Sequence, residues 1–201
     1  MKEIDSNITG HLPKITLDYI NNVSSVSEFY NRENKLENYY DQLIEKRKNY
    51  NNNFRRPLCE VLKSNYENIS QNSLQITAIN NLAKDDTFTV TTGHQLNIFS
   101  GPLMVLYKIA QVISTANYLN SKINDFNYVP VFWIASEDHD FDEISEVNLE
   151  KNSVIWNLDS KNSPVGKIEL NDFEEVIQSY KDSIIDFEFK DVLESLIDSS
   201  Y

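Results

Sequence analysis

The alternation of apolar and polar positions predicts a strand, a helix and a second strand in the middle of the chain. Residues 87–92 are β-branched and aromatic, residues 103–120 carry apolar side chains at helical spacing, and residues 128–135 form a second apolar run. Strands separated by one helix are typical of a βαβ unit in a parallel sheet. Apolar residues surround almost the whole helix, with Lys108 as its only charge before Ser121, which predicts burial on more than one side.

The residues before this unit predict a helical lead-in that packs on the core. Helices are expected over residues 34–50, 57–65 and 73–84, where apolar side chains recur three and four positions apart. Pro57 and Pro102 are each expected at the first position of a helix, where a missing N–H costs nothing. We therefore divide the chain into a lead-in, residues 1–84, and the first part of an α/β core with an acidic β/α extension, residues 85–201.

The pattern after the second strand predicts only short elements. Residues 153–158 and 165–170 resemble two short strands, and residues 172–181 and 189–199 have helical periodicity. Two parallel strands do not complete an α/β domain, so we expect this chain to be the front part of a longer protein. An incomplete sheet leaves an edge of unpaired N–H and C=O groups, so we also expect marginal stability from these residues alone.

Composition narrows the class of protein. The 201 residues carry a net charge of −13 and a single cysteine, Cys59. The charge argues against a nucleic-acid partner, which would need a basic face, and one cysteine cannot form an internal disulfide. No apolar run approaches the ~20 residues of a membrane span, and the first residues lack the apolar core of a signal peptide. We expect a cytoplasmic protein without a membrane partner.

The negative charge is concentrated at one end of the chain. Residues 137–201 contain 18 Asp and Glu against 5 Lys and Arg. Such charge runs are usually solvated surface. The carboxylates closest to the second strand are candidates for a site, because they lie where a parallel sheet binds its ligands.

Polar residues gather where each predicted strand ends. The first strand is followed by Gly93, His94 and Gln95, and the second by Ser136, Glu137, Asp138, His139 and Asp140. In open parallel sheets, ligands bind outside the carboxyl ends of the strands. We therefore expect the two clusters to face each other across one cleft.

The first cluster suits an anion. A glycine directly after a strand lets the backbone approach a ligand, N–H groups at the following helix start can hold an anion, and His94 can donate to a phosphate or carboxylate oxygen. Lys108 could reach the same anion, or extend to solvent. The spacing resembles the His-x-Gly-His signature of nucleotidylyltransferases and class I aminoacyl-tRNA synthetases, with Thr91 in place of the first histidine. The alternative is a glycine turn with a surface histidine.

The second cluster suits an amine or sugar hydroxyls. We predict Asp138, His139 and Asp140 as catalytic residues that include the general base, and Ser136 and Glu137 as substrate-binding residues. Asp and His can also ligate metals, but successive residues of an extended segment point to opposite faces, so we predict no metal. The remaining alternative is a solvated acidic turn.

Two longer stretches resemble the bacillithiol biosynthesis cysteine-adding enzymes, a family of cysteine ligases. Residues 91–108 include TTGHQ, FSGPL and YK, and residues 129–141 read VPVFWIASEDHDF. Members of the family often carry glutamine where His94 stands. That difference favours a polar contact with the substrate over direct catalysis by the imidazole.

The resemblance implies a Rossmann-like core similar to nucleotidylyltransferases, followed by a C-terminal coiled coil outside this chain through which a homodimer could form. It implies a ligase that makes an amide (C–N) bond between L-cysteine and the amine of glucosaminyl malate, with this front part inactive alone. An amide made from a free carboxylate needs activation, and the nucleotidylyltransferase-like core suggests a nucleotide for it, ATP or ADP. Two other hypotheses stay open: an inactive small-molecule-binding module, and a nucleotidyltransferase with another substrate.

Overall fold

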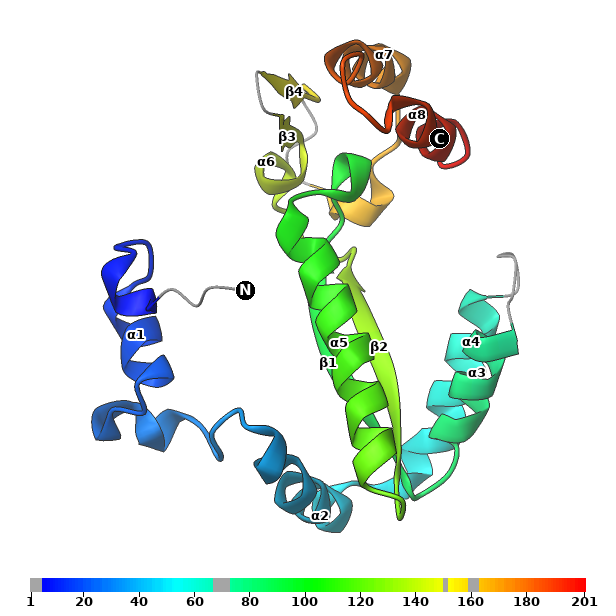
Figure 1. Ribbon diagram of the computed structural model, residues 1–201. Helices are drawn as coiled ribbons and strands as arrows, with labels where there is room; N and C mark the ends of the chain where they lie inside the picture. The colour runs from blue at the N-terminus through cyan, green and yellow to red at the C-terminus, as the bar shows by residue number, and fades with distance from the viewer. Residues whose placement is uncertain (1–4, 67–72, 150–151, 159–162) are drawn as a thin grey trace. The chain divides into compact units, whose positions relative to one another are not determined.

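The computed structural model describes residues 5–66, 73–149, 152–158 and 163–201 (Figure 1). The chain forms two compact units, Met1–Ser70 and Gln71–Tyr201. The division falls before the boundary expected at residue 84, because helix α4 (Ser73–Leu82) contacts both strands of the central sheet. That the lead-in packs on the core stays a prediction.

The first unit is helical. Its elements are η1 (Ser6–Ile8), α1 (Lys14–Ile20), η2 (Ser24–Phe29), η3 (Leu36–Asn38), α2 (Tyr39–Asn49), η4 (Asn52–Phe54) and α3 (Arg55–Asn65). The helices expected over residues 34–50 and 57–65 are confirmed. Pro57 is the third residue of α3 and not the first, because η4 runs directly into the helix at Arg55. The position is tolerated because the first four N–H groups of a helix have no intrahelical partner.

The second unit is built on a parallel strand pair, β1 (Thr87–Gln95) and β2 (Asn127–Ala135), joined by α5 (Leu103–Lys122). Phe88 pairs with Tyr128, so the predicted parallel arrangement is confirmed. Strand β1 is longer than expected because Gly93 stays in the ladder opposite Trp133. A Cβ at Gly93 would lie 2.8 Å from the Trp133 carbonyl oxygen, so only glycine allows this close approach.

Helix α5 lies along the strand pair (Figure 1) and buries one face. Val112, Thr115, Ala116 and Leu119 form the buried stripe. Six other large side chains are exposed in the described part of the chain: Leu103, Met104, Leu106, Tyr107, Ile113 and Tyr118. Among the described residues of the second unit, the expected burial on more than one side is therefore wrong for these side chains, because the strand pair packs on one face of the helix. Pro102 occupies the N-cap position, directly before the first residue of α5, and not the first helical position as expected.

The acidic extension contains α6 (Phe141–Ile144), β3 (Glu146–Asn148), β4 (Ser153–Ile155), η6 (Val165–Lys167), α7 (Phe173–Ser183) and α8 (Lys190–Asp198). Both expected helices are confirmed. The expected strand over residues 165–170 is wrong: the N–H groups of Val165 and Gly166 donate to the carbonyls of Asp138 and Ser136, and η6 forms instead. Strand β4 pairs antiparallel with β3.

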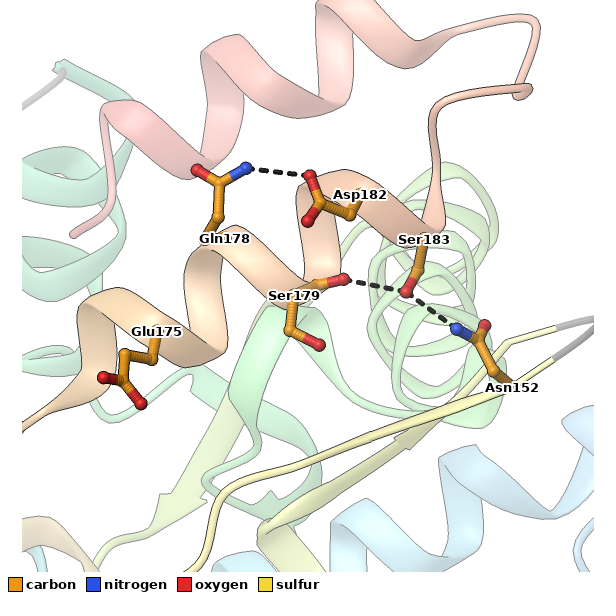
Figure 2. Close-up of a pocket in the computed structure, with 6 residues that line it drawn as sticks. All are labelled: Asn152, Glu175, Gln178, Ser179, Asp182 and Ser183. Carbon is orange, nitrogen blue, oxygen red and sulfur yellow. Dashed lines mark hydrogen bonds between the residues drawn. The ribbon is translucent and has the colours of Figure 1, made fainter.

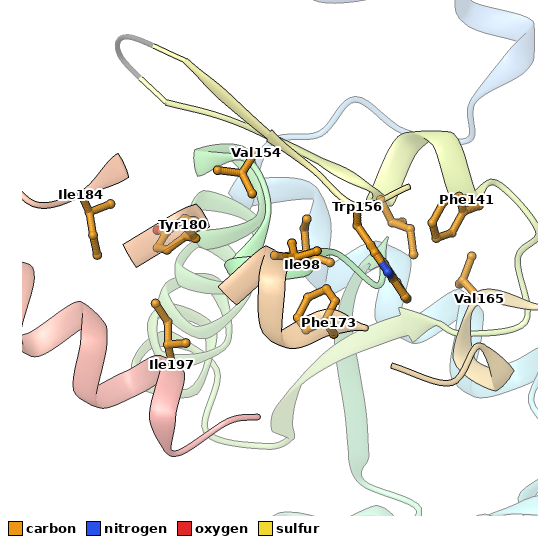
Figure 3. Packing of buried hydrophobic residues seen from close by; sticks show 11 residues of the cluster. Ile98, Phe141, Val154, Trp156, Val165, Phe173, Tyr180, Ile184 and Ile197 are labelled. Atoms are coloured by element: carbon orange, nitrogen blue, oxygen red, sulfur yellow. The ribbon is translucent and has the colours of Figure 1, made fainter. Parts of the chain in front are cut away.

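The extension has its own apolar core, which also takes in the β1–α5 loop (Figure 3). The buried members are Ile98, Phe141, Ile144, Val154, Trp156, Val165, Phe173, Val176, Tyr180, Ile184 and Ile197. Ile98 comes from η5 (Ile98–Ser100), and its neighbour Phe99 stacks on Tyr180 with ring centroids 4.1 Å apart. The loop that follows β1 is thus held by the extension as well as by the sheet.

Candidate functional site

The two polar clusters meet at the carboxyl edge of the strand pair. Gln95 and Ala135 are the last paired residues, so both chains leave the sheet at the same level. The Gln95 side chain reaches the acidic turn, where its Nε2 donates to Asp138 Oδ2 at 2.5 Å. Direct contact thus replaces the expected cleft between these two residues.

The orientation of the Gln95 carboxamide follows from this contact. A carboxylate only accepts hydrogen bonds, so the nitrogen must face Asp138. The amide oxygen, Oε1, is then buried without a hydrogen-bond partner in the described residues. An unsatisfied buried polar atom costs about 1–3 kcal/mol. Contact with Asp138 is therefore kept at a cost, which favours a functional reason for it.

Asp138 is an exposed carboxylate that stays ionised. The hydrogen bond from Gln95 lowers its pKa below the ordinary value, and the backbone N–H of His139, 2.7 Å from Oδ1, adds to the effect. A carboxylate with a lowered pKa is a weak proton acceptor at neutral pH. The geometry therefore favours Asp138 as a group that binds a cation over Asp138 as the general base.

The other acidic side chains turn in different directions. Asp140 caps α6, accepting from the backbone N–H of Glu143 at 3.3 Å. Glu137 Oε1 accepts from Trp133 Nε1 at 3.4 Å. In the part of the chain that the structure describes, no group of three or more His, Cys, Asp or Glu is placed to hold a metal ion. The cluster thus divides into Asp138, which Gln95 contacts from β1, and two carboxylates with partners close in sequence.

Ser136 begins the acidic turn and is exposed. Its carbonyl accepts from the N–H of Gly166 at 2.8 Å. A Cβ at Gly166 would lie 2.6 Å from the Cβ of Ser136. Gly166 was not predicted as a site residue, because it lies far from Ser136 along the chain and no local pattern links the two residues.

The first cluster is organised around a strand and not around a helix start. Gly93 and His94 lie in β1, whereas α5 begins ten positions later, at Leu103. The expected cradle of helix N–H groups directly after Gly93 is therefore not formed. The positive charge beside the first cluster is that of Lys108 on α5, which is half-buried. Its Nζ donates to the Gly93 carbonyl at 3.1 Å. An ammonium has three donors, so this bond leaves capacity for a ligand oxygen.

His94 has a partner that sequence analysis missed. The side-chain nitrogen of Asn97 lies 3.1 Å from His94 Nδ1 and donates to the Gln95 carbonyl at 3.0 Å. Asn97 lies between the two halves of the first motif. A polar side chain directly after a strand was the available signal.

A hollow of about 480 Å³ lies elsewhere in the second unit (Figure 2). Its lining consists of Asn152 and five residues of α7: Glu175, Gln178, Ser179, Asp182 and Ser183. The side chains bond one another, with Gln178 donating to Asp182 at 2.8 Å and Asn152 to Ser183 at 2.9 Å. The described residues that line it include two carboxylates and no cation, so the hollow is unsuited to the anion expected at the first cluster.

Comparison with known proteins identifies the class to which this fold and site belong. The model of the family "Bacillithiol biosynthesis BshC, N-terminal Rossmann-like domain" matches residues 1–201. The chain belongs to this family, and the predicted Rossmann-like fold class is confirmed. None of the helices in the described residues is long and apolar enough to cross a membrane.

Relatives of this chain carry the name "Putative cysteine ligase BshC". The protein from Flavobacterium johnsoniae is 38% identical over 198 residues, which are 98% of this chain and 37% of the relative. That from Christiangramia forsetii is 35% identical over 196 residues, 96% of this chain and 36% of the relative. The chain thus spans little more than a third of the length of these relatives.

Proposed function

We propose that this chain is the N-terminal part of a ligase that joins L-cysteine to the amine of glucosaminyl malate through an amide bond. The family match over all 201 residues is the observation that carries the proposal. The relatives are named cysteine ligases. Because the chain spans 37% of the first of them, the activity proposed is that of the full-length protein.

The charges at the carboxyl edge support this pair of substrates. Asp138 offers an ionised carboxylate to an ammonium or to sugar hydroxyls. On the β1 side, His94 and Lys108 offer N–H donors to a carboxylate or a phosphate. Cysteine and glucosaminyl malate each carry both an amine and a carboxylate, so each can use one half of the site. Hydrogen bonds to charged groups are worth about 1.5–3 kcal/mol.

An amine must lose a proton to form an amide. We assign this step to His139, whose side chain is exposed beside Asp138, because a neutral imidazole accepts protons at neutral pH. Asp138 would hold and orient the cationic group. Asp140 would act indirectly, by capping the helix that follows the turn.

ATP is the proposed source of activation. When bound, it would activate the cysteine carboxylate for attack by the amine. The donors on His94 and Lys108 fit an anionic oxygen, which phosphate and carboxylate have in common. The similarity to nucleotidylyltransferases, together with this donor set, supports a nucleotide on the β1 side.

The test is a ligation assay with the full-length protein. L-cysteine and glucosaminyl malate are incubated with and without ATP, and the amide product is detected by mass. We expect Asp138→Asn to lower the rate about ten- to a hundredfold, since one charge-assisted hydrogen bond is lost. Asp182→Asn in α7 is the matched control and should ligate at the parental rate.

Three results would contradict the proposal in different ways. Absence of the amide product with every nucleotide would remove the ligase function and favour a binding module. Pyrophosphate release with other acceptors would favour a nucleotidyltransferase. A parental ligation rate for Asp138→Asn would leave the ligase intact and reduce the acidic cluster to a solvated turn.

A further inference from the structure

We propose that Asn97 is a positioning residue that holds the imidazole of His94 in the tautomer with its proton on Nε2. The functional consequence rests on the proposed function, in which His94 donates to an anionic oxygen of a substrate. The tautomer itself is a property of the folded chain. It can therefore be tested separately from ligation.

The hydrogen bonds that Asn97 donates fix the orientation of its carboxamide. Its Nδ2 donates to the carbonyl of Gln95 at 3.0 Å. A carbonyl only accepts, so this contact sets which end of the carboxamide is the NH₂ group. The same NH₂ group lies 3.1 Å from His94 Nδ1. A donor at that distance requires a lone pair on Nδ1, so the proton of the neutral ring lies on Nε2.

One contact favours the opposite tautomer. His94 Nδ1 also lies 3.3 Å from the Gln95 carbonyl, which could accept from an Nδ1–H group. That distance exceeds the preferred range for an N–H···O bond. It would also place an N–H of the ring against the NH₂ of Asn97, with no acceptor between them. Asn97 therefore decides between the two tautomers.

The loop after Asn97 is folded closely over this side chain. Gly101 adopts φ +65°, and a Cβ there would lie 2.6 Å from the Cβ of Asn97 and 2.7 Å from its Cγ. Phe99 and Ser100 also have positive φ, 48° and 70°. These conformations are disfavoured for residues with side chains. A turn of this shape persists only where its surroundings hold it.

The acidic extension holds the turn. The Phe99 ring stacks on Tyr180, and the backbone N–H of Phe99 donates to the Tyr201 hydroxyl at 3.2 Å. The Gly101 N–H donates to the carbonyl of Ile98, whose side chain is buried in the core of the extension. The strained turn, the close approach of Gly101 and the placement of Asn97 thus form one arrangement. In this arrangement the contacts of the His94 ring to the described residues are made at Nδ1, which leaves the Nε2–H to donate to a ligand.

The tautomer decides whether Nε2 of His94 attracts or repels an anionic oxygen. An Nε2–H group attracts a carboxylate or phosphate oxygen, whereas an Nε2 lone pair repels it. Glutamine at the same position would also present an N–H. The anion half of the site thus needs a donor and not a proton acceptor, and Asn97 keeps the histidine in the donor form.

The direct test is nuclear magnetic resonance of the intact protein labelled with ¹⁵N-histidine. Spectra that correlate ring protons with ring nitrogens are recorded at a pH where each ring is neutral, as checked by titration. We expect the parental His94, assigned by loss of its signals in His94→Gln, to carry its proton on Nε2. In Asn97→Asp, the carboxylate can only accept, so the proton should move to Nδ1. Asn117→Asp on the exposed side of α5 makes the same change of charge and should leave the ring as in the parent.

An Nδ1–H tautomer in the parent, or an unchanged tautomer in Asn97→Asp, would overturn the inference whatever the ligation rates are. His139 provides an internal reference, because its signals should be the same in the parent and in the Asn97 variant. If Asn97→Asp failed to fold, the signals of His94 and His139 would both change. Asn97→Ala would then replace it, and the expected result is a mixture of the two His94 tautomers.

The functional half is tested by ligation in the full-length protein. We expect Asn97→Asp to lose about ten- to a hundredfold in rate, the effect of losing one hydrogen bond to a charged group. In a His94→Gln background, Asn97→Asp should cost less than threefold, because no tautomer remains to be selected. Parental ligation by Asn97→Asp with a switched tautomer would overturn the binding role of His94. Equal losses in both backgrounds would overturn positioning as the cause.

Discussion

At the scale of single residues, one side-chain contact, two backbone hydrogen bonds and one missing side chain set the geometry of the acidic turn. Gln95 holds the carboxylate of Asp138, and the N–H groups of Val165 and Gly166 hold the carbonyls of Asp138 and Ser136, at 2.7 and 2.8 Å. Val165 is itself anchored in the core of the extension. The turn is therefore held from the strand side and from the extension at once.

Gly166→Ala should displace this turn. The new methyl would lie 2.6 Å from the Cβ of Ser136 and 2.9 Å from its carbonyl oxygen, and overpacking of this kind costs about 1–3 kcal/mol. As Asp138 moves from Gln95, the pKa of its carboxyl should rise toward the ordinary value. Chemical denaturation measures the loss of stability, and carboxyl titration by nuclear magnetic resonance measures the pKa of Asp138.

Lys167→Ala, exposed in the same 3-10 turn, is the control and should leave both the stability and the titration of Asp138 nearly as in the parent. An unchanged Asp138 titration in Gly166→Ala would show that the turn keeps its position without the close contact.

At the scale of elements, the sheet depends on a side chain of its covering helix. The carboxamide of Asn120 in α5 donates to the Tyr128 carbonyl and accepts from the Tyr128 N–H, both at 2.8 Å. A single asparagine thus bonds both backbone groups of one residue of β2, on the side away from β1. It aligns the end of α5 with the beginning of the strand.

Asn120→Ala should destabilise the second unit by about 2–6 kcal/mol, because the N–H and the carbonyl of Tyr128 both lose their bond to the Asn120 carboxamide and an unsatisfied buried group costs about 1–3 kcal/mol. The free energy of unfolding, from urea denaturation, measures this effect. Asn117→Ala makes the same exchange on the exposed side of α5 and corrects for helix propensity. Equal stability of the two variants would rule out the anchoring role of Asn120.

At the scale of the whole molecule, apolar surface remains uncovered in the described residues. Strands β1 and β2 form a sheet of two. Leu103, Met104 and Tyr107 of α5 are each more than half exposed. Trp133 of β2 is 59% exposed beside the acidic turn. The relatives are nearly three times as long as the matched region, since it covers 37% of the first of them.

Residues 1–201 produced alone should therefore be marginally stable and prone to aggregate, whereas the full-length protein should unfold cooperatively. Open sheet edges and exposed apolar faces both favour association between chains. Light scattering during heating, compared between the two proteins at equal concentration, makes the measurement. A monodisperse sample of residues 1–201 with a sharp thermal transition would contradict this expectation.

The sequence by itself determined the elements whose signals are local. Helices α2, α3 and α4, the strand–helix–strand unit, and helices α7 and α8 of the extension follow from side-chain spacing within one segment, whereas the short helix α1 was not predicted. The motif stretches indicated the family. The parallel pairing and the meeting of the two polar clusters at one sheet edge also followed, because the carboxyl ends of parallel strands lie together.

Only the tertiary structure decided the roles of individual polar residues. Gln95 bonds Asp138 across 43 positions of sequence, and Phe99 bonds Tyr201 across 102. Residues 165–167 form a turn and not a strand, because their N–H groups bond a turn far away in sequence. The spacing of apolar side chains indicates which face of one segment is buried. It does not indicate which distant atom accepts a hydrogen bond from a given donor. That physical difference separates what could be predicted here from what could not.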